Sequence, residues 1–151
     1  LNDRQLDNPA IIGIHTGGAW VAQQLNLLLE LAEPSGLLDI SFYRDDFTRI
    51  GVNPQVKPSQ IHFDVEDRNI ILVDDVLHTG RTIRAAMNEI FDFGRPASIT
   101  LVTLIERSGR ELPIQADVIG LSPPLALEDR IKLTGPDPLA LEILHGRRTR
   151  P

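Results

Sequence analysis

The sequence contains no cysteine among its 151 residues. The chain therefore forms no disulfide, offers no thiolate ligand to a metal ion and has no cysteine nucleophile. It also lacks any run of about 18 apolar residues, the length that a membrane-spanning helix needs, and it shows no amphipathic targeting leader. We therefore expect a cytoplasmic protein that does not contact a membrane.

Positive charge is scarce, because 15 Lys and Arg residues face 21 Asp and Glu residues and leave a net charge of −6. This balance argues against a generic binder of polyanions, although a local basic cluster is compatible with it. Residues 146–151, GRRTRP, form such a cluster, which we interpret as a solvated tail. The length and the apolar fraction of 42% predict one globular domain over residues 1–151. Because the chain begins with Leu1 rather than Met, we expect an N-terminal segment to be missing.

Short apolar runs alternate with helical patterns along the chain. A helix from about Ala19 should end before Pro34, and a second one has an apolar stripe from Ile83 to Phe91 and should end at Gly94. Strands that are apolar on both faces and alternate with helices predict an α/β fold with a central, mostly parallel sheet. The strand candidates are residues 10–14, 37–43, 70–73, 98–105 and 117–120.

Two segments lack a regular pattern. Residues 44–58 are polar and contain Gly51, Pro54 and Pro58, and a loop of that length is usually functional or disordered. From Leu121 onward the chain is irregular and rich in proline, so we expect a small cap outside the sheet, over about residues 121–145.

Two turns follow buried strand candidates and carry residues suited to ligand binding. In an open parallel sheet, such turns meet at the carboxyl ends of the strands and face one crevice. The first turn is HTGG, residues 15–18, and the second lies in DDVLHTGRT, residues 74–82. In the second turn, the hydroxyls of Thr79 and Thr82 and the amides near Gly80 stand at a helix N-terminus, which favours a bound phosphate.

Adjacent carboxylates, Asp74 and Asp75, precede that phosphate site. Each carboxylate can accept a hydrogen bond from one of two vicinal sugar hydroxyls, and Mg²⁺ would offset their mutual repulsion. The pattern therefore indicates a ribose phosphate as ligand. The alternative is structural, with the acids capping the turn and Thr82 capping the helix.

Residues 70–82, IILVDDVLHTGRT, resemble the phosphoribosyl-pyrophosphate motif of the type I phosphoribosyltransferases. Three segments are also similar to the PyrR family, whose members regulate the pyrimidine operon and are uracil phosphoribosyltransferases. These segments are SFYRDDFT (41–48), VDDVLHTGRTIRAAMNEIFDFGRPASI (73–99) and ERSGRELPIQADVIG (106–120), and the resemblance runs from about Ile11 to Leu133. It implies a type I phosphoribosyltransferase fold with a flexible flap and a C-terminal hood.

The resemblance also implies a reaction and its site residues. Uracil and phosphoribosyl pyrophosphate would yield UMP and pyrophosphate with Mg²⁺, through an oxocarbenium-like transition state. Asp74 and Asp75 would be the catalytic residues that hold the ribose hydroxyls. Mg²⁺ would arrive with the substrate, with Asp74 or Asp75 as its candidate protein ligand. The remaining predicted contacts are the phosphate site (Asp74, Asp75, Val76, Leu77, His78, Thr79, Gly80, Arg81, Thr82), the pyrophosphate loop (His15, Thr16, Gly17, Gly18), the flap of about 43–61 (Tyr43, Arg44, Asp45) and the nucleotide or base contacts Arg107 and Ile131.

One position departs from the family pattern. The pyrophosphate loop of the family usually reads TRG, whereas this chain has Gly17 in the place of the arginine. A backbone amide is a weaker phosphate partner than a bidentate guanidinium, so leaving-group stabilisation should suffer. A nucleotide sensor with weak or no catalysis is therefore one alternative, and a purine-type transferase is another. We interpret His78 as a solvated loop histidine rather than an acid or base.

The resemblance implies further partners. Family members are dimers or tetramers and bind the leader of pyr messenger RNA on a basic face. Candidate residues for such a face are Arg81, Arg84, Arg95, Arg107 and Arg110, but the net charge of −6 opposes tight binding of RNA.

Overall fold

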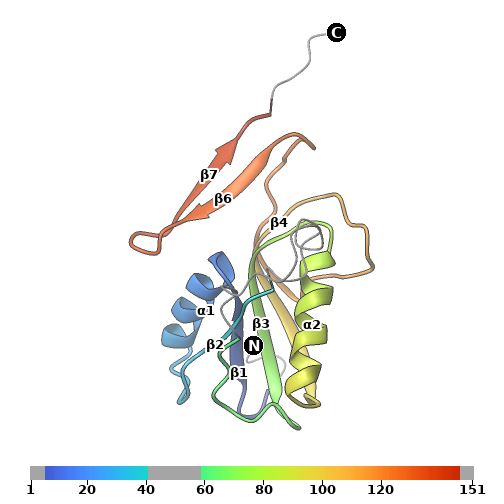
Figure 1. The fold of residues 1–151 in the computed structure, drawn as a ribbon. Coiled ribbons are helices and arrows are strands. Elements are labelled where there is room, and N and C mark those ends of the chain that lie inside the picture. Colours follow the sequence, from blue (N-terminus) through green and yellow to red (C-terminus); the bar gives the residue numbers. More distant parts are fainter. Residues whose placement is uncertain (1–5, 41–58, 147–151) are drawn as a thin grey trace, which may run out of the picture.

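A central parallel sheet forms the body of the protein, seen in a computed structural model that describes residues 6–40 and 59–146 (Figure 1). Its five strands lie in the order β2-β1-β3-β4-β5 and all neighbouring pairs are parallel. Helices α1 (Gly17–Leu28) and α2 (Arg81–Phe93) cover opposite faces of the sheet (Figure 1). The α/β fold that the sequence predicts is thus confirmed. The strands are β1 (Ala10–Ile14), β2 (Gly36–Leu38), β3 (Asn69–Leu77), β4 (Ser98–Glu106) and β5 (Val118–Leu121).

The central strands are apolar at consecutive positions because each of their faces meets a helix. In β3, Ile70 and Leu72 belong to the same cluster as Ile83 of α2, whereas Ile71 and Val73 belong to the cluster that contains Val21 of α1. Successive strand residues point to opposite faces, so a continuous apolar run serves both layers. This arrangement places the carboxyl ends of β1 and β3 side by side.

Strand β3 is longer than its sequence pattern predicts. The predicted strand ends at Val73, but β3 continues through both acids to Leu77 because β4 runs beside it to Glu106. The ladder pairs Asp74 with Thr103. The two adjacent carboxylates therefore belong to the strand rather than to the turn that follows it.

Other boundaries agree more closely with the patterns. Helix α2 ends just before Gly94, as predicted. Phe91, however, is 56% exposed although the predicted stripe includes it, because the helix buries only a narrow stripe of Ile83, Ala86 and Ile90. Helix α1 ends at Leu28, well before Pro34, and Glu30 beyond it has a positive φ of 52°. The predicted strand 37–43 is shorter in the structure, because β2 ends at Leu38 and residues 39–40 are not part of a strand. Residues 41–43 lie outside the described residues.

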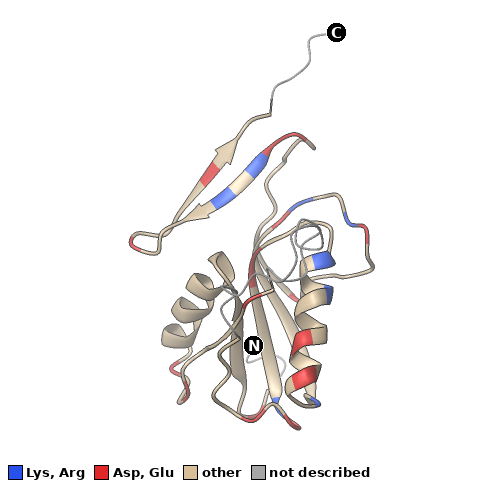
Figure 2. Cartoon of the chain, in the orientation of Figure 1, with Lys and Arg blue, Asp and Glu red and all other residues tan. Residues whose placement is uncertain are grey.

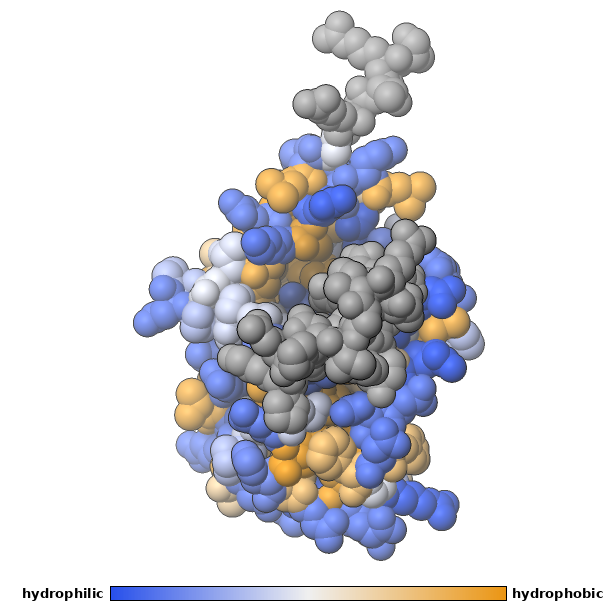
Figure 3. Space-filling view, in the orientation of Figure 1, coloured by the Kyte–Doolittle hydropathy of each residue, from blue (hydrophilic) through white to orange (hydrophobic). Residues whose placement is uncertain are grey.

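A separate antiparallel hairpin forms most of the cap that we expect after Leu121. Strands β6 (Arg130–Thr134) and β7 (Ala140–Leu144) pair with each other and not with the sheet, and they extend beyond its carboxyl end (Figure 1). Leu133, 5% exposed, packs in the cluster that contains Val21. Strand β7 is exposed along its whole length, and hydrophobic side chains reach the surface in this part of the molecule (Figure 3).

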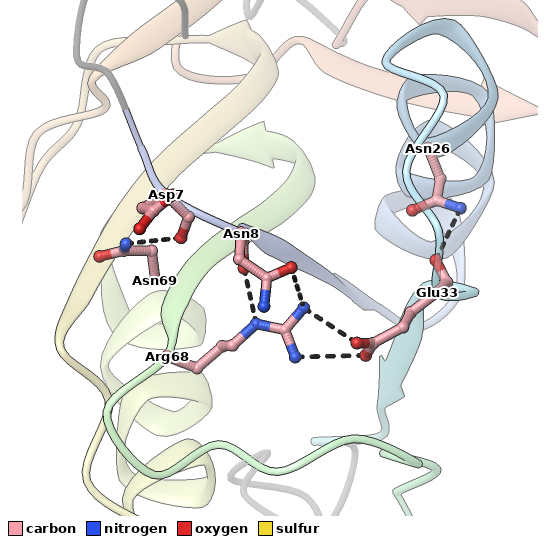
Figure 4. A network of polar contacts seen from close by, with 6 residues as sticks. All are labelled: Asp7, Asn8, Asn26, Glu33, Arg68 and Asn69. Carbon is pink, nitrogen blue, oxygen red and sulfur yellow. Dashed lines mark hydrogen bonds and ion pairs between the residues drawn. The ribbon is translucent and has the colours of Figure 1, made fainter.

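The opposite end of the sheet is held by a polar network around Arg68 (Figure 4). The Arg68 guanidinium donates to the carbonyl of Asn8 at 2.6 Å, pairs with Glu33 at 3.1 Å and lies over the ring of Phe63. These contacts join the segment before β1, the segment between α1 and β2 and the start of β3. Among the described residues, no helix has the length and apolar character needed to cross a membrane.

Candidate functional site

A cleft of about 680 Å³ lies at the carboxyl ends of β1 and β3. It brings together both turns that the sequence singles out and adds a wall from the β6–β7 hairpin. Sheet and hairpin therefore share one cavity, of a size typical for small-molecule sites. Its lining residues are Ile14, His15, Thr16, Gly17, Trp20, Asp39, Ile40, Asp74, Asp75, Val76, Thr82, Lys132 and Leu133.

The first turn, His15–Gly18, passes directly against β3. The amide of His15 donates to the Leu38 carbonyl at 2.8 Å, and the His15–Thr16 peptide bond is cis. A Cβ on Gly17 would overlap the carboxylate of Asp75 and lie 2.7 Å from its Cγ, and one on Gly18 would lie 2.6 Å from the Val73 carbonyl. The turn therefore requires glycine for close approach, and an arginine at position 17 would displace Asp75.

Both acids are oriented by backbone amides. Asp74, 5% exposed, accepts a hydrogen bond at its Oδ1 from the amide of Asp75 at 2.8 Å. Asp75 accepts at its Oδ1 from the amide of Val76 at 2.9 Å. A carboxylate can accept about four hydrogen bonds, so a carboxylate that is oriented by a backbone amide can also accept from a sugar hydroxyl.

The second turn joins β3 to the N-terminus of α2. Gly80 has a φ of 94°, which a residue with a side chain rarely adopts, and the Thr79 hydroxyl accepts from the amide of Arg81 at 3.2 Å. The first turn of α2 has no acidic residue, so nothing there neutralises the positive end of the helix dipole. Two arginines lie in the part of α2 near this end and its acidic residues lie toward the other end (Figure 2). The arrangement favours an anion beside the start of α2.

The structure divides the predicted phosphate residues into two groups. Val76 and Thr82 line the cleft beside the two acids, whereas His78, Thr79 and Gly80 shape the turn behind it. Leu77 is a core residue, 1% exposed. Arg81 points to Glu111, with its Nε 2.9 Å from the carboxylate.

The loop after β4, residues 107–112, braces the phosphate turn. The amide of Arg107 donates to the Leu77 carbonyl at 3.0 Å, a guanidinium nitrogen of Arg110 donates to the His78 carbonyl at 2.6 Å, and the amide of Glu111 donates to the Thr79 carbonyl at 2.9 Å. These bonds hold three consecutive carbonyls and so fix the path from β3 to α2. The shape of the turn therefore depends on residues distant in sequence.

His78 lies in the loop after β3, as the sequence suggested, but its side chain is less exposed to solvent than expected. It is partly buried, and its ring packs so closely on Gly109 that a Cβ there would lie 2.7 Å from Nε2. Burial lowers the pKa of His78 below 6.5, and the positive charges of Arg107 and Arg110 lower it further against the opposing effect of Glu111. The neutral imidazole is therefore favoured.

The two predicted nucleotide or base contacts, Arg107 and Ile131, are not among the residues that line the cleft. The Arg107 guanidinium donates to the carbonyls of Asp129 and Ala126, just before β6. Ile131 is partly buried on β6, and its neighbours Lys132 and Leu133 line the cleft instead. Sequence reasoning missed six lining residues: Ile14, Trp20, Asp39, Ile40, Lys132 and Leu133. The only usable signal was that Lys132 is next to the predicted contact Ile131.

No group of three or more His, Asp or Glu side chains is placed to hold a metal ion within the described part of the chain. Three carboxylates nevertheless line the cleft, those of Asp39, Asp74 and Asp75. Mg²⁺ usually binds through one or two carboxylates together with substrate phosphates, so this set fits a cation that arrives with its substrate. The predicted flap residues Tyr43, Arg44 and Asp45 lie outside the described residues.

Known proteins share both the sequence and the fold of this chain. The phosphoribosyl transferase domain family matches residues 1–132. The Bifunctional protein PyrR of Nitrosococcus oceani is 62% identical over 145 residues, which cover 95% of this chain and 82% of the relative. The chain belongs to the PyrR family.

Further matches support this PyrR-family assignment. The Bifunctional protein PyrR of Pseudomonas paraeruginosa is 56% identical over 94% of this chain and 84% of its own length. A purine phosphoribosyltransferase from Pyrococcus horikoshii has a TM-score of 0.61 at 25% identity, over 82% of this chain and 75% of that structure. A hypoxanthine-guanine phosphoribosyltransferase from Bacillus anthracis, with a TM-score of 0.60 at 17% identity over 82% and 72% of the two chains, shows the shared fold. The family and the phosphoribosyltransferase fold expected from the sequence are thus confirmed.

Proposed function

We propose that this PyrR-family chain transfers the phosphoribosyl group of phosphoribosyl pyrophosphate to uracil, and that nucleotide binding in the same cleft regulates pyrimidine genes. One observation carries the proposal: a single cleft holds the adjacent acids, the glycine turn and the N-terminal end of α2. Each of these features suits a different part of a ribose carrying a 5′-phosphate and a pyrophosphate. We place the protein in the cytoplasm.

The residues of the cleft would act by position and charge. A uracil ring nitrogen forms the new bond to the anomeric carbon as the bond to the pyrophosphate oxygen breaks, and the proton of that nitrogen is released. Asp74 and Asp75 hold the ribose hydroxyls, and their negative charge favours the cationic character of the ribose in the transition state. The amides at the start of α2 hold the 5′-phosphate, and the backbone of residues 15–18 faces the leaving group. No covalent intermediate is required.

Magnesium fits the cleft because three carboxylates line it while the proposed substrate is a polyanion. When bound with pyrophosphate, the cation would neutralise charge that develops on the leaving group. Asp74 and Asp75 are the candidate protein ligands.

The decisive experiment measures UMP formation from radiolabelled uracil, phosphoribosyl pyrophosphate and Mg²⁺. Replacing Asp75→Asn removes a charge-assisted hydrogen bond worth about 1.5–3 kcal/mol, so the rate should fall by roughly 10- to 100-fold. The matched control is Asp92→Asn, an exposed acid of α2 outside the cleft, which should keep the wild-type rate. Absence of UMP formation by the wild-type chain would contradict the proposed activity.

Two other functions considered from the sequence are less favoured. A sensor without catalysis does not match relatives that carry the name bifunctional protein. A purine-type transferase rests on neighbours of 25% and 17% identity, far below the 62% identity of the PyrR relative. An assay with hypoxanthine and guanine in place of uracil separates these substrates.

The regulatory half of the proposal concerns RNA and assembly. Arg84 and Arg95 are exposed, whereas Arg107 is buried, Arg81 pairs with Glu111 and Arg110 pairs with Glu106. The candidate basic face is therefore smaller than the sequence suggests. A gel shift with the leader transcript of the chain's own operon, repeated across salt concentrations, tests binding, and analytical ultracentrifugation tests the proposed dimer or tetramer.

A further inference from the structure

The cleft combines several negative charges with one basic side chain. The carboxylates of Asp39, Asp74 and Asp75 line it, and Lys132 of β6 is the single Lys or Arg in the lining that the described residues form. The pyrophosphate group of the proposed substrate is itself a polyanion, so like charges meet in this cavity. The position of Lys132 therefore decides which part of the substrate meets this basic side chain.

The two glycines of the first turn leave no room for a cationic side chain. A Cβ on Gly17 would lie 2.7 Å from Cγ of Asp75, and one on Gly18 would lie 2.6 Å from the Val73 carbonyl. Positions 17 and 18 therefore offer backbone amides to the leaving group, and these carry no full positive charge. A protein cation that meets the leaving group at these glycines has to come from another segment of the chain.

Packing of the hairpin brings β6 to the side of the cleft where this turn lies. Leu133, the neighbour of Lys132, is 5% exposed and packs in one cluster with Trp20 and Val21, in the first two turns of α1. Helix α1 begins at Gly17, and the hairpin lies above this helix in the view of Figure 1. The proposed 5′-phosphate site, by contrast, lies at the start of α2, which covers the opposite face of the sheet. Lys132 is thus placed nearer to the leaving group than to the 5′-phosphate.

The ammonium group of Lys132 is available to a bound anion. The side chain is exposed, and the register of the hairpin places it opposite Glu142 of β7. Within residues 6–40 and 59–146, no ion pair joins these two side chains. An exposed pair of this kind stabilises a protein little even where it forms. A phosphate group can therefore bind Lys132 without displacing another partner.

We propose that Lys132 is a catalytic residue whose ammonium contacts the pyrophosphate group, an inference that rests on the proposed phosphoribosyl transfer. As the bond between the anomeric carbon and the pyrophosphate oxygen breaks, its electron pair stays on that oxygen. The ammonium donates a hydrogen bond to the leaving group and keeps its own proton, while the proton of the uracil nitrogen is released to solvent. Because negative charge grows on the leaving group in the transition state, this contact raises kcat.

Two residues of the hairpin serve as matched controls. Arg130 lies two positions before Lys132 on β6 and hence on the same face of the strand, it is also exposed, and it does not line the cleft. Glu142 tests a purely structural role, because a lysine that only supports the hairpin through Glu142 would lose its effect when either side chain is neutralised. Arg130→Met and Glu142→Gln therefore separate the position of the charge from its presence on the hairpin.

The experiment measures the rate of UMP formation, and by calorimetry the binding of UMP and of pyrophosphate with Mg²⁺ and UMP present. Lys132→Met removes the charge and keeps a long side chain, so kcat should fall roughly 10- to 100-fold and pyrophosphate affinity about tenfold, the effect of one charge-assisted hydrogen bond. The affinity for UMP alone should stay within about twofold of wild type. Lys132→Arg should recover most of the rate, and Arg130→Met and Glu142→Gln should keep wild-type values.

Three results would overturn the proposal. The first is a wild-type kcat and pyrophosphate affinity in Lys132→Met. The second is a loss of UMP affinity as large as the loss of pyrophosphate affinity, which would place the ammonium at the nucleotide. The third is an equal loss in Glu142→Gln, which would assign Lys132 a role in the hairpin alone. If the wild-type chain forms no UMP, the proposed function fails, while its pyrophosphate affinity relative to Lys132→Met still tests the contact, and a wild-type chain that does not bind pyrophosphate overturns it.

Discussion

The two turns of the cleft have the same order of elements, a strand, a glycine and a helix, but they need glycine for different physical reasons. The pyrophosphate turn (His15–Gly18) and the phosphate turn (His78–Thr82) each leave a buried strand, pass through glycine and enter a helix. In the first turn, glycine is needed because β3 lies too close for a Cβ. In the second, Gly80 is needed because its φ is 94°. Glycine is therefore required in the two turns for two different reasons, close approach of a neighbouring strand in the first and a positive φ in the second.

The difference also divides the chemistry. The first turn presents a backbone that lies directly against the Asp75 carboxylate, so a side chain added at Gly17 would meet that acid. The second turn adds hydroxyls and a helix N-terminus, and the loop of residues 107–112 holds it from behind. A substitution in the first turn should therefore disturb the acids, whereas one in the second should act locally.

The largest effect is expected for Gly17→Arg. Although the family pattern has an arginine here, its Cβ would collide with Asp75, so the substitution should lower the rate of UMP formation by roughly 10- to 100-fold, the worth of a lost charge-assisted hydrogen bond. Steady-state kinetics with uracil measure it. Gly17→Ala carries the same Cβ and should cause a loss of similar size, which separates the collision from any effect of the guanidinium. A rate above wild type in the arginine variant would show that Asp75 can move aside without harm.

The next largest effect is a difference in the free energy of unfolding between alanine substitutions at Gly18 and at Gly80. Gly18→Ala places a Cβ 2.6 Å from the Val73 carbonyl, a backbone atom that cannot rotate away, and should lower the free energy of unfolding by about 1–3 kcal/mol. Gly80→Ala meets its nearest side chain at 3.3 Å and suffers mainly from its positive φ, which costs about 1 kcal/mol. Urea denaturation measures both. Equal losses would contradict the distinction between close approach and backbone conformation.

A smaller effect separates the two threonines of the phosphate turn. Thr82 lines the cleft, so Thr82→Ala should weaken UMP binding by roughly three- to tenfold, one neutral hydrogen bond, with little change in stability. Thr79 caps the amide of Arg81, so Thr79→Ala should lower stability by about 1 kcal/mol. Calorimetric titration with UMP and thermal melting provide the two readouts. A loss of UMP affinity confined to Thr79→Ala would reverse the assignment.

The smallest effect concerns pH. Burial and nearby arginines hold the pKa of His78 below 6.5, so the unfolded chain takes up a proton at a higher pH than the folded chain does. Stability contributed by the neutral imidazole is therefore present above pH 6.5 and declines as the pH falls toward the pKa of the folded state. Urea denaturation between pH 7.5 and 5.5 should show a steeper loss for wild type than for His78→Asn. If the free energy of unfolding changed with pH equally in wild type and His78→Asn, His78 would not be a cause of the pH dependence.

Local pattern predicted much of the fold and part of the site. The run at Ala10–Ile14, the stripe of α2 and its end at Gly94 follow from side-chain periodicity and from glycine, which act within a few residues. The extension of β3 to Leu77 did not follow, because the hydrogen bonds that continue the strand come from β4. Phe91 was wrongly expected to be buried, because the width of a buried stripe depends on the surface that the helix meets.

The site shows the same division. The sequence alone predicted which groups form the candidate site: two adjacent acids, a glycine turn and hydroxyls at a helix N-terminus, because short spacing in the chain guarantees their proximity. Only the tertiary structure decided that Trp20 and Lys132 line one cleft, that Gly17 leaves no room beside Asp75 and that Arg107 donates to a carbonyl just before β6. Those contacts join segments far apart in sequence, and packing of the sheet, not local pattern, sets their distances.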